Sequence, residues 1–164
     1  MVNIIAQLDQ DRWTEYRKLR LKALEEIPQA FLDDADTSRL QPQEYWLQRM
    51  ANMVFAEEDR QLVGMIGCHR DQRGKLNHIV NLVSFYVISD KRGQGVGEQL
   101  LRKVIDLYSH DPSVKKFQLG VIETQTAAIN LYLKLGFIQS GVQKFAVRVG
   151  SKYYSEILME KYSH

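Results

Sequence analysis

A glycine-rich stretch at positions 91–101 has the residue types that bind phosphate. It reads KRGQGVGEQLL, so three alternating glycines follow two cations, Lys91 and Arg92. Glycine has no Cβ, and a glycine-rich backbone can therefore approach a phosphate closely. The next residues have helical spacing, and the free N–H groups at a helix start attract anions. We expect this loop to bind a phosphate or pyrophosphate, unless its glycines serve only to reverse the chain.

Two common phosphate-binding motifs do not match this loop. The P-loop requires Gly-Lys-Ser/Thr after four spacer residues, and the loop lacks that tripeptide. The dinucleotide-binding motif requires Gly-x-Gly-x-x-Gly at the start of a βαβ unit, whereas the glycines here alternate evenly. If this loop binds phosphate, it therefore does so as part of a motif other than these two.

The loop is expected between a strand and a helix of a mixed domain. Hydrophobic periodicity and turn residues predict strands at 3–8, on both sides of an acidic turn at 57–59, and at 78–88, 115–122, 137–144 and 154–161. They predict helices at 11–27, 42–50, 97–109 and 125–135. This order predicts an α/β (α+β) fold in one domain over 1–164, with a single mixed, mostly antiparallel central sheet flanked by helices.

Composition limits the possible partners. The chain of 164 residues has a net charge of only +2, which does not indicate a nucleic-acid or membrane-surface protein. Its single cysteine, Cys68, follows an apolar run and is expected to be buried, without a disulfide or a thiolate metal site. No apolar run approaches the ~18 residues of a membrane span, and no secretory signal pattern is visible. We expect a cytoplasmic monomer or homodimer with no metal, nucleic-acid or membrane partner.

Read as Arg-x-x-Gly-x-Gly, the loop resembles the acyl-CoA pyrophosphate loop of the GNAT N-acetyltransferase superfamily. The matching residues are Arg92, Gly93, Gln94, Gly95, Val96 and Gly97. The segment TQTAAINLYLKLGF is similar to the family's Asn-x-x-Ala-x-x-x-Tyr-x-x-x-Gly-Phe helix, and its matching residues are Gln125, Ala128, Tyr132, Gly136 and Phe137. The order of elements also resembles the family over nearly the whole chain. Gln125 departs from the asparagine that the family prefers.

The resemblance implies a binding site for acetyl-CoA as co-substrate. It implies that the strand ending at 84–87 diverges from the strand at 116–121, and that pantetheine lies between them. The backbone of Phe85, Tyr86 and Val87 would hold pantetheine, while residues 92–97, Gln125 and Tyr132 would also bind the coenzyme. The Val87 N–H would face the thioester oxygen. Tyr132 is the candidate general acid for the leaving thiolate, and its alternative role is coenzyme binding alone.

The implied reaction moves an acetyl group from acetyl-CoA to a primary amine by direct attack in a ternary complex. The family often uses a glutamate on the central strand as base, and some members use one on the next strand, at the position of Gly120. Neither glutamate is present here. Glu123, His78, Ser84 through a water molecule, or no protein base at all remain alternatives. A non-catalytic acyl-CoA-binding sensor or interaction module on the same fold is the second possible function.

The resemblance places the amine acceptor between the N-terminal helices and the last strands. Candidate aromatic residues there are Phe31, Tyr45, Trp46 and Tyr153. Arg20 interrupts an apolar helix face and could bind a substrate carboxylate or form an internal salt bridge. An acidic cluster could attract a cationic acceptor such as a polyamine, or could simply be a solvated loop; it comprises Glu25, Glu26, Asp33, Asp34 and Asp36.

Overall fold

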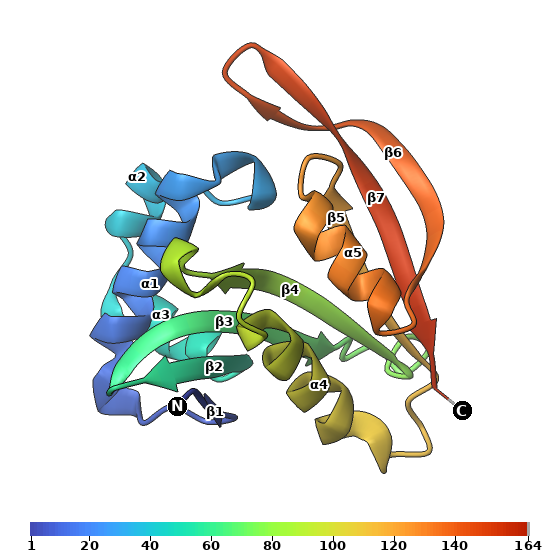
Figure 1. Cartoon of the computed structure of the whole chain (residues 1–164), viewed down its shortest axis with the longest axis horizontal. Coiled ribbons are helices and arrows are strands. Elements are labelled where there is room, and N and C mark those ends of the chain that lie inside the picture. Colours follow the sequence, from blue (N-terminus) through green and yellow to red (C-terminus); the bar gives the residue numbers. More distant parts are fainter. Residues whose placement is uncertain (164) are drawn as a thin grey trace.

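Seven strands form one mixed sheet in the computed structural model, which describes residues 1–163 (Figure 1). The strands are β1 (Asn3–Ile5), β2 (Met53–Glu58), β3 (Gln61–Arg70), β4 (Ile79–Val87), β5 (Lys116–Ile122), β6 (Ile138–Val149) and β7 (Lys152–Tyr162). Their order across the sheet is β1-β2-β3-β4-β5-β7-β6, and β4–β5 is the parallel pair among antiparallel neighbours. The predicted mixed, mostly antiparallel sheet is confirmed.

Helices cover both faces of this sheet. They are α1 (Trp13–Glu26), α2 (Ala35–Arg39), α3 (Gln43–Met50), α4 (Val96–Ser109) and α5 (Thr126–Lys134), with short 3-10 turns η1 (Gln10–Arg12), η2 (Pro28–Ala30) and η3 (Ser89–Lys91). Helix α2 was not predicted, because its sequence is acidic and polar. Asp34 starts it by accepting a hydrogen bond from the Thr37 backbone N–H at 2.8 Å.

Two apolar clusters, one on each face, hold the layers together. Tyr16 of α1 and Trp46 of α3 pack with Phe55 on one face, and all three are fully buried. Leu100 and Leu101 of α4 pack with Phe117 on the other face, together with Cys68. Cys68 is buried as predicted, and this burial raises the pKa of its thiol.

The strands β4 and β5 separate after a short paired region. They pair only from Ile79–Lys116 to Asn81–Gln118, where the Gln118 side chain donates to Asn81 Oδ1 at 2.8 Å. Beyond this point β5 pairs only with β7, and Figure 1 shows β4 and β5 diverging. The predicted gap between these strands is therefore confirmed.

A bulge in β4 lies beside this gap. Met65 of β3 pairs with Tyr86, whereas Gly67 pairs with Val83, so Ser84 and Phe85 together face the single residue between the two β3 partners. Ser84 has a φ of 57°, in the left-handed region that a residue with a side chain rarely adopts. The bulge turns the end of β4 relative to its start, at the place where the gap opens.

Candidate active site: a coenzyme gap and an acceptor pocket

The glycine loop presents unpaired backbone donors at the start of α4. Gly95 has a φ of 83° and stands directly before the helix, and Gly93 has a φ of 71°. The backbone N–H groups of residues 93–97 have no hydrogen-bond partner within the described chain. A Cβ added at Gly93 or Gly95 would have no atom within 4 Å, so the space beside the Cα atoms of these two glycines is open. The loop is therefore suited to an anion such as a pyrophosphate.

The cations before the glycines are held by other parts of the protein. Lys91 forms an ion pair with Glu58, at the turn between β2 and β3. Arg92 donates through Nε to the Val87 carbonyl oxygen at 2.9 Å and forms an ion pair with Glu26 at the end of α1. In this arrangement the donors that face the open space are backbone amides, and Arg92 contributes a positive charge nearby.

Gly97 brings α4 close to the end of β4. A Cβ at this position would lie 2.9 Å from Cζ of Phe85, closer than side-chain contacts allow. Phe85 in turn lies beside Tyr132 of α5, with ring centroids 5.9 Å apart. The two sequence motifs, 92–97 and 125–137, therefore meet at Phe85.

The backbone at the end of β4 is oriented towards the gap. The Ile88 N–H donates to the Val63 carbonyl of β3 at 2.9 Å. Because successive N–H groups of an extended strand point in opposite directions, the Val87 N–H points away from β3. This orientation meets the requirement for a donor to a thioester oxygen in the gap. The Tyr86 side chain lies on the other face, where its hydroxyl donates to Glu26 at 2.6 Å.

Tyr132 is 4% exposed and packs between aromatic rings. Its ring centroid lies 5.6 Å from that of Phe137 and, as above, close to Phe85. Burial raises the pKa of its phenol, which therefore stays protonated at neutral pH. Gln125 stands at the start of α5 and makes no side-chain capping bond. Glu98 pairs with Arg102 and Lys134 and so points away from the loop, as its repulsion by phosphate predicts.

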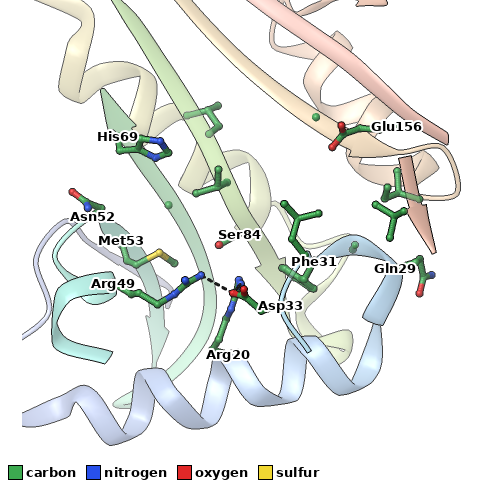
Figure 2. Close-up of a pocket in the computed structure, with 18 of the residues that line it drawn as sticks. Arg20, Gln29, Phe31, Asp33, Arg49, Asn52, Met53, His69, Ser84 and Glu156 are labelled. Carbon is green, nitrogen blue, oxygen red and sulfur yellow. Dashed lines mark hydrogen bonds and ion pairs between the residues drawn. The ribbon is translucent and has the colours of Figure 1, made fainter. Parts of the chain in front are cut away.

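On the α1 and α3 face, a pocket of about 480 Å³ opens beside the gap. Arg20 of α1 and Arg49 of α3 line one side, and both contact Oδ2 of Asp33 at 3.0 Å. Glu156 of β7 lies on the opposite side, and Ser84 lies between them (Figure 2). The pocket therefore has a cationic and an anionic wall, separated by the end of β4.

Glu156 occupies space that exists only because residue 120 is glycine. The two strands pair so that Ile122 faces Glu156, and the glutamate side chain leans over Gly120. A Cβ added to Gly120 would lie 2.2 Å from Glu156 Oε1. Within residues 1–163, the Glu156 carboxylate has no hydrogen-bond or ion-pair partner. It is therefore available to a ligand in the pocket.

The comparison with known proteins decides the family. The model of the acetyltransferase (GNAT) family matches residues 7–137, which is most of the chain. This chain belongs to the GNAT acetyltransferase family.

Solved structures of acetyltransferases share the fold of the whole chain. A GNAT-family acetyltransferase from Streptococcus pneumoniae has 22% identity and a TM-score of 0.85, and the match covers 100% of both chains. A ribosomal-protein-alanine N-acetyltransferase from Brucella melitensis has 20% identity and a TM-score of 0.78, over 99% of both chains. A putative acetyltransferase from Salmonella typhimurium, solved with its cofactor acetyl-CoA, has 17% identity and a TM-score of 0.80, over 99% of this chain and 94% of that one.

Three residues were expected from the sequence as candidate bases of a GNAT enzyme. Of these, Ser84, at the bulge in β4, lines the pocket. Glu123 is exposed and accepts a hydrogen bond from the Ser155 backbone N–H at 3.0 Å. The backbone carbonyl of His78 binds the N–H of Lys115 at 2.8 Å, at the narrow end where β4 and β5 start. Glu156 was missed, because the distance between its strand and Gly120 in sequence conceals that they are neighbours in the sheet.

Most of the acceptor aromatics expected for a GNAT enzyme lie elsewhere. Phe31 lines the pocket. Trp46 is fully buried in the core, and Tyr45 packs edge-on against it. Tyr153 is 55% exposed and packs edge-on against Phe145 near the tip of the β6–β7 hairpin, which projects beyond the sheet in Figure 1.

The acidic cluster also has internal partners. Glu25 and Asp36 pair with Arg39, Asp34 caps α2, and Glu26 and Asp33 make the contacts described above. Arginines therefore offset much of the negative charge of this cluster. Among residues 1–163, no cluster of His, Cys, Asp and Glu suits a metal ion, and no helix is both long and apolar enough to cross a bilayer.

Proposed function

We propose that this GNAT protein transfers an acetyl group from acetyl-CoA to the nitrogen of a primary amine by direct attack in a ternary complex. One observation carries the proposal: the unpartnered Glu156 carboxylate lies beside the gap between β4 and β5, on the face that holds the pocket. The amine would approach from this face. The coenzyme would lie in the gap with its diphosphate on the free amides of residues 93–97.

The residues at the gap can assist each change of charge. Glu156 takes a proton from the ammonium or from the attacking nitrogen as the C–N bond forms. The Val87 N–H donates to the oxygen that becomes negative, which is worth about 3 kcal/mol in comparable sites. Tyr132 donates its proton to the thiolate when the C–S bond breaks, and solvent then returns a proton to the phenolate. General acid and base groups each contribute about 10²–10⁴-fold.

The first test is thiol release from acetyl-CoA with a panel of amines, peptide N-termini and lysine peptides. Release that depends on an amine supports the proposal. Acetyl-CoA binding without release from any amine would instead identify a sensor.

The second test concerns Glu156. Glu156→Gln should lower kcat by about 10²-fold and leave coenzyme affinity unchanged. The double variant Gly120→Glu/Glu156→Ala brings the carboxylate to the same space from β5 and should recover part of the rate. If Glu156→Gln keeps the wild-type kcat at every pH, the protein has no base at this position.

A further inference from the structure

The cationic wall of the pocket has a hydrogen-bond donor for which the protein itself provides no acceptor. Arg20 is 3% exposed, and its Nη2 binds Asp33 while its Nη1 has no hydrogen-bond partner. The Tyr16 hydroxyl, beside it in the pocket wall, is also buried, and Arg49 is its polar neighbour. A buried donor without an acceptor destabilises the folded protein, more so when it is charged, and such groups are rare in native proteins.

Internal contacts do not satisfy Nη1 of Arg20. The Phe31 ring centroid lies 4.9 Å from the Arg20 guanidinium carbon, and its face attracts the charge without offering a lone pair to Nη1. Asp33 gives both arginines the same oxygen and supplies one negative charge against two positive ones. The Arg49 side chain is 33% exposed, so an incoming anion can reach it from the pocket.

The charge and size of the pocket together indicate which kind of ligand would bind to the free donor of Arg20. The wall formed by Arg20, Arg49 and Asp33 carries a net positive charge, while Glu156 on the opposite side is negative (Figure 2). A ligand with an anionic and a cationic end matches both walls. A guanidinium binds a carboxylate through two parallel hydrogen bonds, and a pocket of about 480 Å³ has the size of a small-molecule site.

We propose that the acceptor amine is a small molecule that also carries a carboxylate, as an amino acid does, and that Arg49 and Arg20 bind this carboxylate. Its ammonium then lies towards Glu156 and the gap. This inference rests on the proposed acetyl transfer and adds the substrate class to it. The neighbouring Tyr16 hydroxyl supplies a neutral donor to the same carboxylate.

Pairs of acceptors that differ only in having a carboxylate or a carboxamide test the proposed substrate class directly. Amino acids should have a KM at least about 10-fold lower than their carboxamides, the size of a charge-assisted hydrogen bond. The amide has the more easily deprotonated amine, so reactivity alone would favour the amide. A series with longer spacers between amine and carboxylate then measures the distance between the two walls. Equal KM values for acids and amides would overturn the inference.

The substitution Arg49→Gln tests whether Arg49 binds the substrate carboxylate. It should raise KM about 10-fold for acids and leave the KM for amides unchanged, whereas a merely structural role would lower kcat for both. The control is Arg73→Gln, which removes a guanidinium that is 76% exposed and pairs with Asp71 outside the pocket. It should change neither value.

Binding of reaction products separates this inference from the proposed function. Calorimetry of the CoA-loaded protein should detect N-acetyl amino acids and show much weaker binding of N-acetyl amino amides. If the acids bind selectively but no amine is ever acetylated, the carboxylate site stands and the transferase function fails. If acids and amides are acetylated and bound alike, the function stands and the carboxylate site fails.

Discussion

Gly120 and Glu156 are complementary in shape. A carboxylate can reach one point on a sheet face from either of two adjacent strands, because neighbouring strands lie only about 4.8 Å apart. Relatives with a glutamate at the position of Gly120 would fill that point from β5, and here β7 fills it. The missing glutamate of the sequence motif therefore does not mean a missing carboxylate in the site.

Gly120→Ala is predicted to lower kcat without unfolding the protein. The new Cβ would lie 2.2 Å from Glu156 Oε1 and would displace the flexible carboxylate rather than backbone. We expect kcat to fall by about 10-fold or more, towards the loss caused by removing the base, with little change in thermal stability. Gly141→Ala is the control, because its Cβ would meet Leu158 at an ordinary 3.6 Å. Steady-state kinetics with an unchanged kcat would argue against a role for Glu156.

Tyr132→Phe is predicted to keep coenzyme affinity while kcat falls by about 10²-fold, since only the hydroxyl proton is lost. Because burial raises the pKa of Tyr132, the phenol stays protonated at the pH values at which amines lose their protons. The kcat of the wild type should therefore not decline as pH rises towards 10. A fall below pH 9 that disappears in Tyr132→Phe would contradict the assignment.

At the scale of elements, Glu26 joins α1 to the coenzyme region. It accepts hydrogen bonds from Tyr86 of β4 and from Arg92, whose guanidinium also lies 5.5 Å from the Tyr86 ring centroid. Burial alone would raise the pKa of Glu26, but these two donors outweigh it and lower the pKa. The end of α1, the end of β4 and the glycine loop are thus held by one carboxylate.

Glu26→Gln should therefore destabilise the protein in a pH-dependent way. A lowered carboxyl pKa contributes stability above its unfolded value of about 4.3, and this contribution is lost as pH falls through the folded pKa. We expect a loss of about 1–2 kcal/mol in the free energy of unfolding at pH 7 and a smaller loss at pH 3, measured with urea. The control Glu44→Gln removes an exposed acid on α3. An equal loss at both pH values would exclude this linkage.

At the scale of the whole molecule, the sheet consists of two halves joined over three residue pairs of β4 and β5. The proposed coenzyme site and the proposed acceptor pocket lie on the two sides of this junction. Two substrates can thus meet at the gap from opposite faces, and holding both reactants in place is a large part of catalysis.

Hydrogen exchange should locate the coenzyme in this junction. Acetyl-CoA should slow exchange at Val87 and at 93–97, whose amides face the gap and the loop opening. It should leave the β6–β7 hairpin tip, 143–153, unchanged. Protection of the tip without protection of the loop would place the coenzyme elsewhere.

The sequence by itself determined the family, the element order and the glycine loop before α4. These depend on contiguous residues: a phosphate binds to successive backbone amides, so the spacing of three glycines before a helix is a local signal. The same is true of the helix that carries Tyr132.

Only the tertiary structure decided which side chains meet in the acceptor pocket. Arg20, Asp33 and Arg49 come from three segments, and Glu156 reaches Gly120 from a strand more than thirty positions later. Likewise, the capture of Lys91 by Glu58 and of Arg92 by Glu26 could not be predicted. These contacts depend on strand register and helix packing between distant segments, and a register shift of one residue in β7 would turn Glu156 to the other face of the sheet.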